Sequence, residues 1–146
     1  MKLVHLGSVR YVGGDIVPQL IAENHEKYAS KTRSFVQLDL MRDPLPPADV
    51  LLCRDCFIHL SFHDLKIALR NIAKSNITYI LTTTYPKVTV NTDIVTRDFR
   101  GINLQLPLFD FPEPLERIDE DLFPGHHENP NFIRQLGLWR VSELRQ

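Results

Sequence analysis

The chain has 146 residues, of which 43% are hydrophobic and 24% are charged. This length suits one domain spanning residues 1–146, with a core of its own, and is short for two. Seventeen Lys and Arg residues against 18 Asp and Glu residues give a net charge of −1, which argues against a dedicated nucleic-acid binder, because such proteins usually carry a basic excess.

Hydropathy and cysteine content exclude two further classes. No apolar run is long enough to cross a bilayer, and the first residues, "MKLVHLGSVR", lack the apolar stretch of a signal peptide. The two cysteines lie close together beside apolar residues, which favours a reducing compartment over a disulfide scaffold. We therefore expect a cytoplasmic protein with no membrane partner.

Strand and helix patterns alternate along the first half. The first run ends in Gly-Gly-Asp, and the helix after it has Pro18 in its first turn, where proline is well tolerated. Such alternation predicts a parallel sheet with right-handed crossovers. The expected strands cover residues 9–15, 34–40, 48–53 and 77–85, and the expected helices cover residues 17–29 and 61–75.

The helix over residues 61–75 has the clearest pattern. Ser61 can cap its first turn, and Asp64 stands where an acid favours the helix dipole. Its apolar side chains recur at helical spacing and predict one buried stripe. That stripe consists of Leu65, Ala68, Leu69, Ile72 and Ala73.

The pattern changes after Pro86. Residues 86–113 have little periodicity and many Asn, Asp and Pro residues, and we expect a long ordered loop with one short helical turn. Residues 114–121 and 136–144 read as an antiparallel strand pair, joined by an excursion over residues 123–131. His126 and His127 fall in that excursion, and we expect both to be solvated.

The stretch "LLCRDCFIHLSFHD" (residues 51–64) contains a C-x-x-C, which also occurs in dithiol oxidoreductases. Here Cys53 falls inside an apolar strand, where burial would raise its pKa, and Asp55 further opposes thiolate formation. A structural zinc site takes ligands from separated pairs, whereas Cys53, Cys56, His59 and His63 crowd a strand-to-helix break. We expect no metal, and both thiols to be small packing residues.

Acidic residues close three successive strands. In an open parallel sheet, ligands bind beyond the carboxyl ends of the strands, and here those ends carry Asp15, Asp39 and the Arg54-Asp55 pair. A carboxylate that closes the second strand of a nucleotide-binding sheet accepts hydrogen bonds from both ribose hydroxyls. Asp15 alone could equally start a turn, but three acids at successive strand ends are a stronger signal.

The chain resembles the class I S-adenosylmethionine-dependent methyltransferases, in particular a group of bacterial methyltransferase-domain proteins. The likeness spans about residues 9–144 and implies an α/β fold with an open, mostly parallel, Rossmann-like sheet and a C-terminal antiparallel strand pair. It is carried by "YVGGDIVPQLI", "FVQLDLMRDPLPPADVLLCRDCFIHLSF", "YILTTTYP", "NLQLPLFDFPEPL" and "LGLWRVSEL".

The resemblance implies a cofactor, S-adenosylmethionine, and the residues that would contact it. Asp15 would hold the ribose, with Ile16 beside the adenine, and Asp39 with Leu40 would contact the adenine edge. Cys53 and Arg54 would contact the methionine part, and Asp55 and His59 would face the substrate. The methyl acceptor, a small molecule or another unknown group, would bind over residues 86–114, where the polar side chains are Asn91, Asp93, Arg100 and Asn103.

One part of the family's pattern has no counterpart here. In these proteins a first strand, a glycine-containing loop and a helix precede the segment that matches "MKLVHLGSVRYVGGD", and Met1 falls near the end of that helix. Gly7, Gly13 and Gly14 do not lie between a strand and a helix. Because this loop approaches the methionine part of the cofactor, its absence predicts weakened cofactor binding, and slower transfer with it.

The missing first strand would lie between two strands of this chain, which then lose a hydrogen-bonding neighbour. We expect the fold to close the gap by direct pairing of "RYVGG" with "VLLC"; the alternatives are "KLVHL" or another chain. A hydrophobic edge left open would favour self-association into a homo-oligomer.

Three functions follow from these patterns. The first is a methyltransferase-type domain with Asp15 and Asp39 as cofactor anchors, and the second is a non-catalytic remnant or interaction module with the same fold. The third is a nicotinamide-dependent oxidoreductase half, which the lack of a G-x-G-x-x-G motif makes remote.

Overall fold

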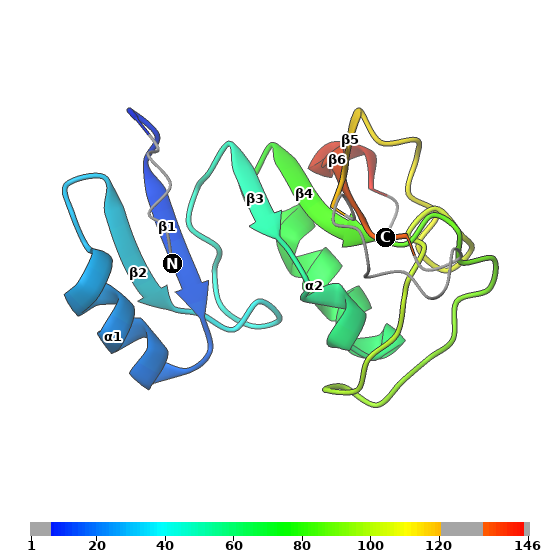
Figure 1. Ribbon diagram of the computed structural model, residues 1–146, viewed down its shortest axis with the longest axis horizontal. Helices are drawn as coiled ribbons and strands as arrows, with labels where there is room; N and C mark the ends of the chain where they lie inside the picture. Colours follow the sequence, from blue (N-terminus) through cyan, green and yellow to red (C-terminus); the bar gives the residue numbers. More distant parts are fainter. Residues whose placement is uncertain (1–6, 121–132, 145–146) are drawn as a thin grey trace.

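The computed structural model describes residues 7–120 and 133–144, which form an α/β fold (Figure 1). The predicted excursion over residues 123–131, His126, His127 and the "KLVHL" segment lie outside these residues. The elements are β1 (Tyr11–Asp15), α1 (Pro18–Tyr28), β2 (Arg33–Gln37), β3 (Val50–Cys53), α2 (Phe62–Lys74), β4 (Tyr79–Thr84), β5 (Glu116–Asp119) and β6 (Gln135–Arg140), with 3₁₀ turns at Phe57–His59 and Val141–Glu143.

The strands form two sheets. β1 pairs with β2 in parallel, and a second sheet has the order β3-β4-β6-β5, with β3 parallel to β4. β6 is antiparallel to both of its neighbours, so among the described strands only β6 runs against the common direction (Figure 1). The predicted fold class is therefore confirmed, including the antiparallel C-terminal pair.

Both helices begin where the sequence predicts. Pro18 opens α1, and the Asp15 carboxylate accepts a hydrogen bond from the Val17 amide at 2.9 Å, which satisfies a donor that the helix leaves free. In α2, the Ser61 hydroxyl accepts from the Asp64 amide at 3.1 Å, as the cap prediction requires.

The predicted apolar stripe of α2 is confirmed at four positions and wrong at the fifth. Leu65, Ala68, Leu69 and Ile72 are buried, whereas Ala73 is exposed. Successive residues of a helix are turned by about 100°, and Ala73 falls beyond the edge of the buried face.

The core lies between α2, β4, β6 and the long segment after β4. Residues 86–115 contain turns and no helix, so the expected helical turn does not form, although Ile102, Leu104 and Phe111 are fully or almost fully buried. Trp139 is 1% exposed, meets Phe111 edge to face, and donates its indole N–H to the Pro112 carbonyl at 2.8 Å. The aromatic residues thus hold the segment against the sheet.

Three consecutive buried threonines of β4 fasten three different parts of the chain. The Thr82 hydroxyl donates to the Cys53 carbonyl of β3 at 2.8 Å. Thr83 accepts from the Asp55 amide at 2.8 Å, just beyond β3. Thr84 donates to the Ile102 carbonyl and accepts from the Leu104 amide, so it attaches the long segment.

The predicted pairing of "RYVGG" with "VLLC" is wrong, because β1 and β3 belong to different sheets. The Tyr11 amide donates to Thr32, and the Asp15 carbonyl accepts from Leu38. Successive residues of a parallel strand turn their backbone groups to opposite sides, so Val12 and Gly14 point theirs away from β2.

The same geometry applies to β3. The Tyr79 amide donates to the Asp49 carbonyl, so Val50 and Leu52 point their backbone groups away from β4. Figure 1 shows β1 and β3 as neighbours, running in the same direction, with no described strand between them. We call these two unpaired sides, at Val12 with Gly14 and at Val50 with Leu52, the open edges.

A connection anchored by hydrogen bonds links the two sheets. The Asn71 side chain of α2 donates to the carbonyls of Leu40 and Asp43, both at 2.9 Å. Leu40 also packs against the core. The link between β2 and β3 is therefore anchored to α2, and this anchor sets the position of β1, α1 and β2 relative to β3.

The N-terminal unit of β1, α1 and β2 has little core of its own. Every buried residue among those described lies between Cys53 and Leu144, and α1 buries none. On the open edges, Val12 is 46% exposed and Leu52 is 57% exposed. Few buried apolar contacts give a segment low local stability.

We expect native-state hydrogen exchange to divide the molecule accordingly. Amides of β1 and β2 should exchange at least tenfold faster than that of Ile80 in β4, because opening the N-terminal unit exposes almost no buried surface. Residue-resolved exchange measured by NMR checks this. Equal protection of β1 and β4 would show that the N-terminal unit unfolds only with the core.

Gly137 offers a test of core packing. A Cβ at this position would lie 2.2 Å from the Trp139 ring, so Gly137→Ala should destabilise the protein by roughly 1–3 kcal/mol through overpacking. Chemical denaturation followed by circular dichroism measures the loss. Gly14→Ala is the matched control, since its Cβ would meet Leu38 at an ordinary 3.5 Å; a larger loss there would contradict the packing argument.

Candidate functional site at the carboxyl edge of the sheets

The predicted site residues of the strands gather at one edge of the molecule. Asp15 ends β1 opposite Gln37, the last residue of β2, and Asp39 follows two residues later. Cys53 ends β3, which points the same way in Figure 1. Cys53 lowers the pKa of Cys56, and the negative charge of Asp15 acts against this shift, so Asp15 lies within electrostatic range of the segment after β3. The edge therefore collects side chains from both sheets.

Asp15 has one oxygen engaged and one available. Its Oδ1 accepts from the Val17 amide, and its Oδ2 has no hydrogen-bond partner within residues 7–120 and 133–144. Ile16 is 58% exposed beside it. A carboxylate held by its own turn, with an oxygen left over, has the chemistry needed to accept hydroxyl donors.

Asp39 is more fully occupied. Its Oδ1 accepts from the Met41 amide at 2.9 Å, and its Oδ2 lies 3.6 Å from the Arg42 guanidinium. Its side chain is 18% exposed. Next to it, Leu40 packs on the core and offers its carbonyl to Asn71. Asp39 thus stabilises its own turn through Oδ1. A ligand would compete with the exposed Arg42 for Oδ2.

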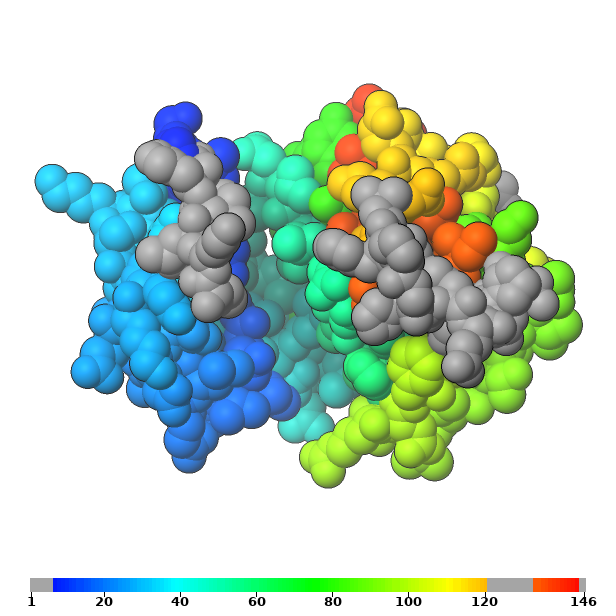
Figure 2. Space-filling model, viewed as in Figure 1, coloured from blue at the N-terminus to red at the C-terminus, as the bar shows by residue number. Residues whose placement is uncertain are grey.

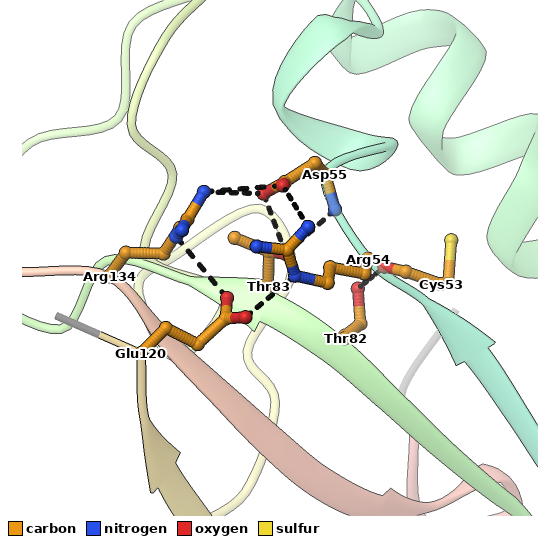
Figure 3. Close-up of polar contacts among 7 residues, drawn as sticks. All are labelled: Cys53, Arg54, Asp55, Thr82, Thr83, Glu120 and Arg134. Carbon is orange, nitrogen blue, oxygen red and sulfur yellow. Dashed lines mark hydrogen bonds and ion pairs between the residues drawn. The ribbon is translucent and has the colours of Figure 1, made fainter. Parts of the chain in front are cut away.

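Beyond β3, four charged side chains close into a ring (Figure 3). Arg54 contacts Asp55 at 3.0 Å and Glu120 at 2.6 Å. Arg134 contacts both of the same acids, each at 3.2 Å. We call this set the charge ring; it joins the end of β3 to the residues just after β5 and just before β6.

The backbone supports the charge ring. Asp55 has a positive φ of 53°, a conformation that costs energy for most residues other than glycine. Its amide donates to the Thr83 hydroxyl, which also reaches its carboxylate at 3.3 Å (Figure 3). The hydrogen bond that Arg54 donates to Glu120 is the main cause of the raised pKa of Arg54. Two cations and two anions therefore neutralise one another at the site.

Arg54 and Asp55 were predicted to contact ligands, whereas Glu120 and Arg134 were not predicted. The available signal was weak: two opposite charges near the adjoining ends of a predicted antiparallel pair, Glu120 inside the first predicted strand and Arg134 before the second. Pairing of β5 with β6 brings them together, since Asp119 lies opposite Gln135. Only this register places both residues beside the end of β3.

The thiols of Cys53 and Cys56 influence each other's pKa. Cys53 is buried, and both the neighbouring Cys56 thiol and its burial raise its pKa. Cys56 is half-buried, and the Cys53 partner lowers its pKa. Hydrogen bonding stabilises the thiolate form of the accepting sulfur. The pair therefore contains one buried thiol with a raised pKa and one half-buried thiol with a lowered pKa.

His59 faces the long segment. Its Nδ1 lies 2.8 Å from the Asp98 carbonyl, and its ring is tilted against Phe99. Its own carbonyl accepts from the Arg97 amide. These contacts dock residues 97–99 onto the turn after β3, and they account for His59 without a ligand.

Asn91 and Asn103 hold the long segment together. Asn91 donates to the Asn103 carbonyl at 2.8 Å and accepts from its amide at 2.9 Å. The Asn103 side chain is buried and donates to the carbonyls of Pro86 and Val88. Buried amides that satisfy backbone groups give an irregular segment a single conformation.

Asp93 and Arg100, the other polar residues predicted over this segment, also have structural contacts. Asp93 accepts from the Phe62 amide at 2.7 Å, which lowers its pKa. Arg100 is 7% exposed, donates to the carbonyls of Phe57 and Ile58, and lies over the Phe62 ring. The segment is thus built onto the start of α2.

Two further searches gave no candidate. Within residues 7–120 and 133–144, no three His, Cys, Asp or Glu side chains are arranged to hold a metal ion. The same residues contain no helix with the length and apolar character of a membrane span.

The fold is shared with solved methyltransferases. The chain superimposes on the N-methyltransferase NodS from Bradyrhizobium japonicum WM9, in complex with S-adenosyl-L-homocysteine, with a TM-score of 0.58 and 14% identity over 90% of this chain. Human N-acetylserotonin methyltransferase, in complex with SAM, superimposes with a TM-score of 0.57 and 14% identity over 90% of this chain. The [4+2]-cyclase SpnF superimposes with a TM-score of 0.55 and 17% identity over 78% of this chain. The chain therefore has the fold of class I S-adenosylmethionine-dependent methyltransferases.

The chain matches only part of each of these proteins, and its sequence identity to them is low. The chain spans 40% of the human enzyme, 66% of NodS and 47% of SpnF. No protein-family model matches it, and no curated protein matches it in sequence. At such identities the shared property is the fold, and one of these structures is named as a cyclase.

The thiol pair gives a test of the local electrostatics. We expect iodoacetamide to alkylate Cys56 at least tenfold faster than Cys53, because Cys56 has the lowered pKa and the greater exposure. The rate at Cys56 should reach half its maximum below the pH of about 8.5 typical of a free thiol. Mass spectrometry of the labelled peptides measures both rates.

Cys56→Ser is the control for this experiment. Cys53 remains buried in that variant and should stay slow to react. Equal rates at the two thiols of the unaltered protein would contradict the opposite directions of the two pKa shifts.

Proposed function

We propose that this chain is an S-adenosylmethionine-dependent methyltransferase-like domain. It binds the adenosyl part of the cofactor along the carboxyl edge of the sheets and places a methyl acceptor, a small molecule or another unknown group, over residues 86–114. The observation that carries the proposal is the free Oδ2 of Asp15 at the end of β1, in a fold shared with SAM- and SAH-bound enzymes.

The residues present fit the adenosine part of the cofactor. Asp15 accepts from the ribose hydroxyls through Oδ2 while Oδ1 keeps its turn, and the exposed Ile16 offers an apolar surface to the adenine ring. Asp39 and the backbone of Leu40 lie at the same edge, just beyond the neighbouring strand β2, where they would contact the edge of the adenine ring. A ligand that spans neighbouring strand ends is typical of open sheets.

The methionine part has fewer partners. Arg54 is already paired with Asp55 and Glu120, so it contributes to cofactor binding through its backbone or by leaving the charge ring. Cys53 lies buried behind it. His59, Asn91 and Asn103 shape the substrate side by holding the long segment in place, and Asp55 borders that side from the charge ring. The bound cofactor supplies the methyl group, and the protein's task is to align the acceptor with it.

The second candidate is a non-catalytic module with the same fold. The closed charge ring favours it, because the two charged residues expected to contact ligand satisfy each other (Figure 3). The cyclase among the structural neighbours also shows that this fold does not dictate methyl transfer.

Calorimetry with S-adenosylhomocysteine tests the proposal. We expect saturable binding by the folded protein and, for Asp15→Asn, at least tenfold weaker affinity, because the substitution keeps an oxygen for the Val17 amide and removes the charge that strengthens bonds to the ribose.

Asp49→Asn is the matched control, since Asp49 precedes β3 at the opposite edge of the sheet. Its affinity should equal that of the unaltered chain. Absence of binding heat from folded protein would contradict the proposed function and favour the non-catalytic module. An equal loss in both variants would remove Asp15 from the ribose site.

A further inference from the structure

Arg100 has an unpartnered edge in a buried position. The residue is 7% exposed, and its Nη1 donates to the carbonyls of Phe57 and Ile58, both at 3.3 Å. Its Nε and Nη2 are buried and have no hydrogen-bond partner within residues 7–120 and 133–144. Burying a charged donor without a partner costs free energy, so these two nitrogens indicate an acceptor from outside the described chain.

The neighbouring acid does not supply that acceptor. Burial lowers the pKa of Arg100, and the charge of Asp93 raises it in turn, so the two groups lie within electrostatic range. The Asp93 Oδ1, however, accepts from the amides of Phe62 at 2.7 Å and Ile94 at 2.9 Å. Asp93 is therefore held at the start of α2, while the Phe62 ring lies 5.1 Å from the Arg100 guanidinium and helps to fix it.

The geometry of the free edge selects one class of ligand. Nε and Nη2 lie on the same side of the planar guanidinium, and their N–H bonds run nearly parallel, so the two oxygens of a carboxylate match them. A phosphate dianion is less suited, because the negative charge of Asp93 lies nearby and Asp93 already occupies the start of α2. The free edge of Arg100 therefore favours a carboxylate with a single charge.

The position of Arg100 connects this edge with the candidate site. Its amide donates to the Ile58 carbonyl at 3.1 Å, in the turn that follows the carboxyl end of β3. Arg100 also belongs to residues 86–114, over which the acceptor is proposed to bind. A cation buried there can fix one end of an acceptor molecule.

The free edge is enclosed, so a ligand enters when the outer part of the long segment moves. Figure 2 shows the yellow-green part of this segment at the lower rim of the molecule. Val90 and Val95 are 75% and 76% exposed, and the hydroxyl of Thr96 accepts from the Ser61 amide at 2.9 Å. Hydrogen bonds rather than apolar packing hold this part, and such segments open at a low cost in free energy.

We propose that the Nε and Nη2 edge of Arg100 is the anchor of a carboxylate-binding site, and that the methyl acceptor is a carboxylic acid recognised there. The carboxylate serves recognition, and no bond to it changes. It neutralises the buried cation and satisfies both free donors, so its binding stabilises the folded chain. The identification of this acid as the acceptor rests on the proposed function, whereas the carboxylate site itself does not.

Benzoate and its neutral analogue benzamide test the site on the full chain. We expect saturable binding of benzoate, at least tenfold tighter than that of benzamide, because only the carboxylate pairs two oxygens with the buried cation. In ¹H–¹⁵N NMR spectra, the Arg100 Nε–H signal should shift on saturation with benzoate. Benzamide at the same concentration should leave this signal unchanged.

Paired variants test the role of the guanidinium. Arg100→Lys keeps the charge but removes the two parallel donors, and should weaken benzoate binding at least tenfold. Arg97→Lys is the matched control, because it makes the same exchange at an exposed position of the same segment, and its affinity should be unchanged. Trp139 emission verifies the folded core of each variant.

A third variant keeps the test decisive if Arg100→Lys does not fold. Asp93→Asn retains an oxygen for the Phe62 amide and removes the negative charge that acts on Arg100. Benzoate should then bind about twofold tighter or more, because the repulsion between the two anions is lost. Unchanged or weaker binding would contradict a benzoate site beside Asp93.

Other results would also overturn the proposal. These are the absence of saturable benzoate binding by the folded chain, an unchanged Arg100 Nε–H signal at saturation, and an equal loss of affinity in Arg97→Lys and Arg100→Lys. Tighter binding of inorganic phosphate than of benzoate at the same signal would assign the edge to phosphate groups instead.

Calorimetry with S-adenosylhomocysteine separates this inference from the proposed function. Arg100→Lys should bind S-adenosylhomocysteine as tightly as the unaltered chain does. Benzoate binding by a chain that does not bind S-adenosylhomocysteine would support the carboxylate site and contradict only its assignment to a methyl acceptor. The reverse result would contradict the carboxylate site and leave the proposed function standing.

Discussion

The described structure depends on β4 and the hydrogen bonds of its three threonines. This strand is parallel to β3 on one side and antiparallel to β6 on the other. Thr82 fixes the end of β3, Thr83 fixes Asp55, and Thr84 fixes the long segment, all from buried positions. Buried hydroxyls are stable only when satisfied, so β4 specifies where three unrelated segments must lie. The charge ring and the core around Trp139 are both built on these attachments.

The sequence predicted the regular elements well, because their signals are local. The capping residue Ser61, the stripe from Leu65 to Ile72 and the apolar run before Cys53 each determine an element without reference to distant residues. Strand pairing is a different problem. β1 and β3 belong to different sheets, and Asn71 holds the link between β2 and β3 through Leu40 and Asp43, in contacts between residues about thirty positions apart that no periodicity reveals.

The candidate site was predictable only in part, for a related reason. Position at strand ends indicated Asp15, Asp39, Arg54 and Asp55, and they do lie at one edge. What those side chains contact was not predictable. Asp39 serves its own turn, Arg54 and Asp55 enter the charge ring, and His59 and Asn103 order the long segment. Partners such as Glu120 and Arg134 become neighbours only through the register of β5 and β6.

The location of the single tryptophan has a practical consequence. Trp139 lies in the second sheet, packed on Phe111, while β1, α1 and β2 contribute no buried residue to the core. Its emission therefore reports the melting of only one part of the molecule. Far-ultraviolet circular dichroism also senses α1, so the two optical probes should yield unfolding curves that do not superimpose, and a two-state fit to either would misstate the total stability.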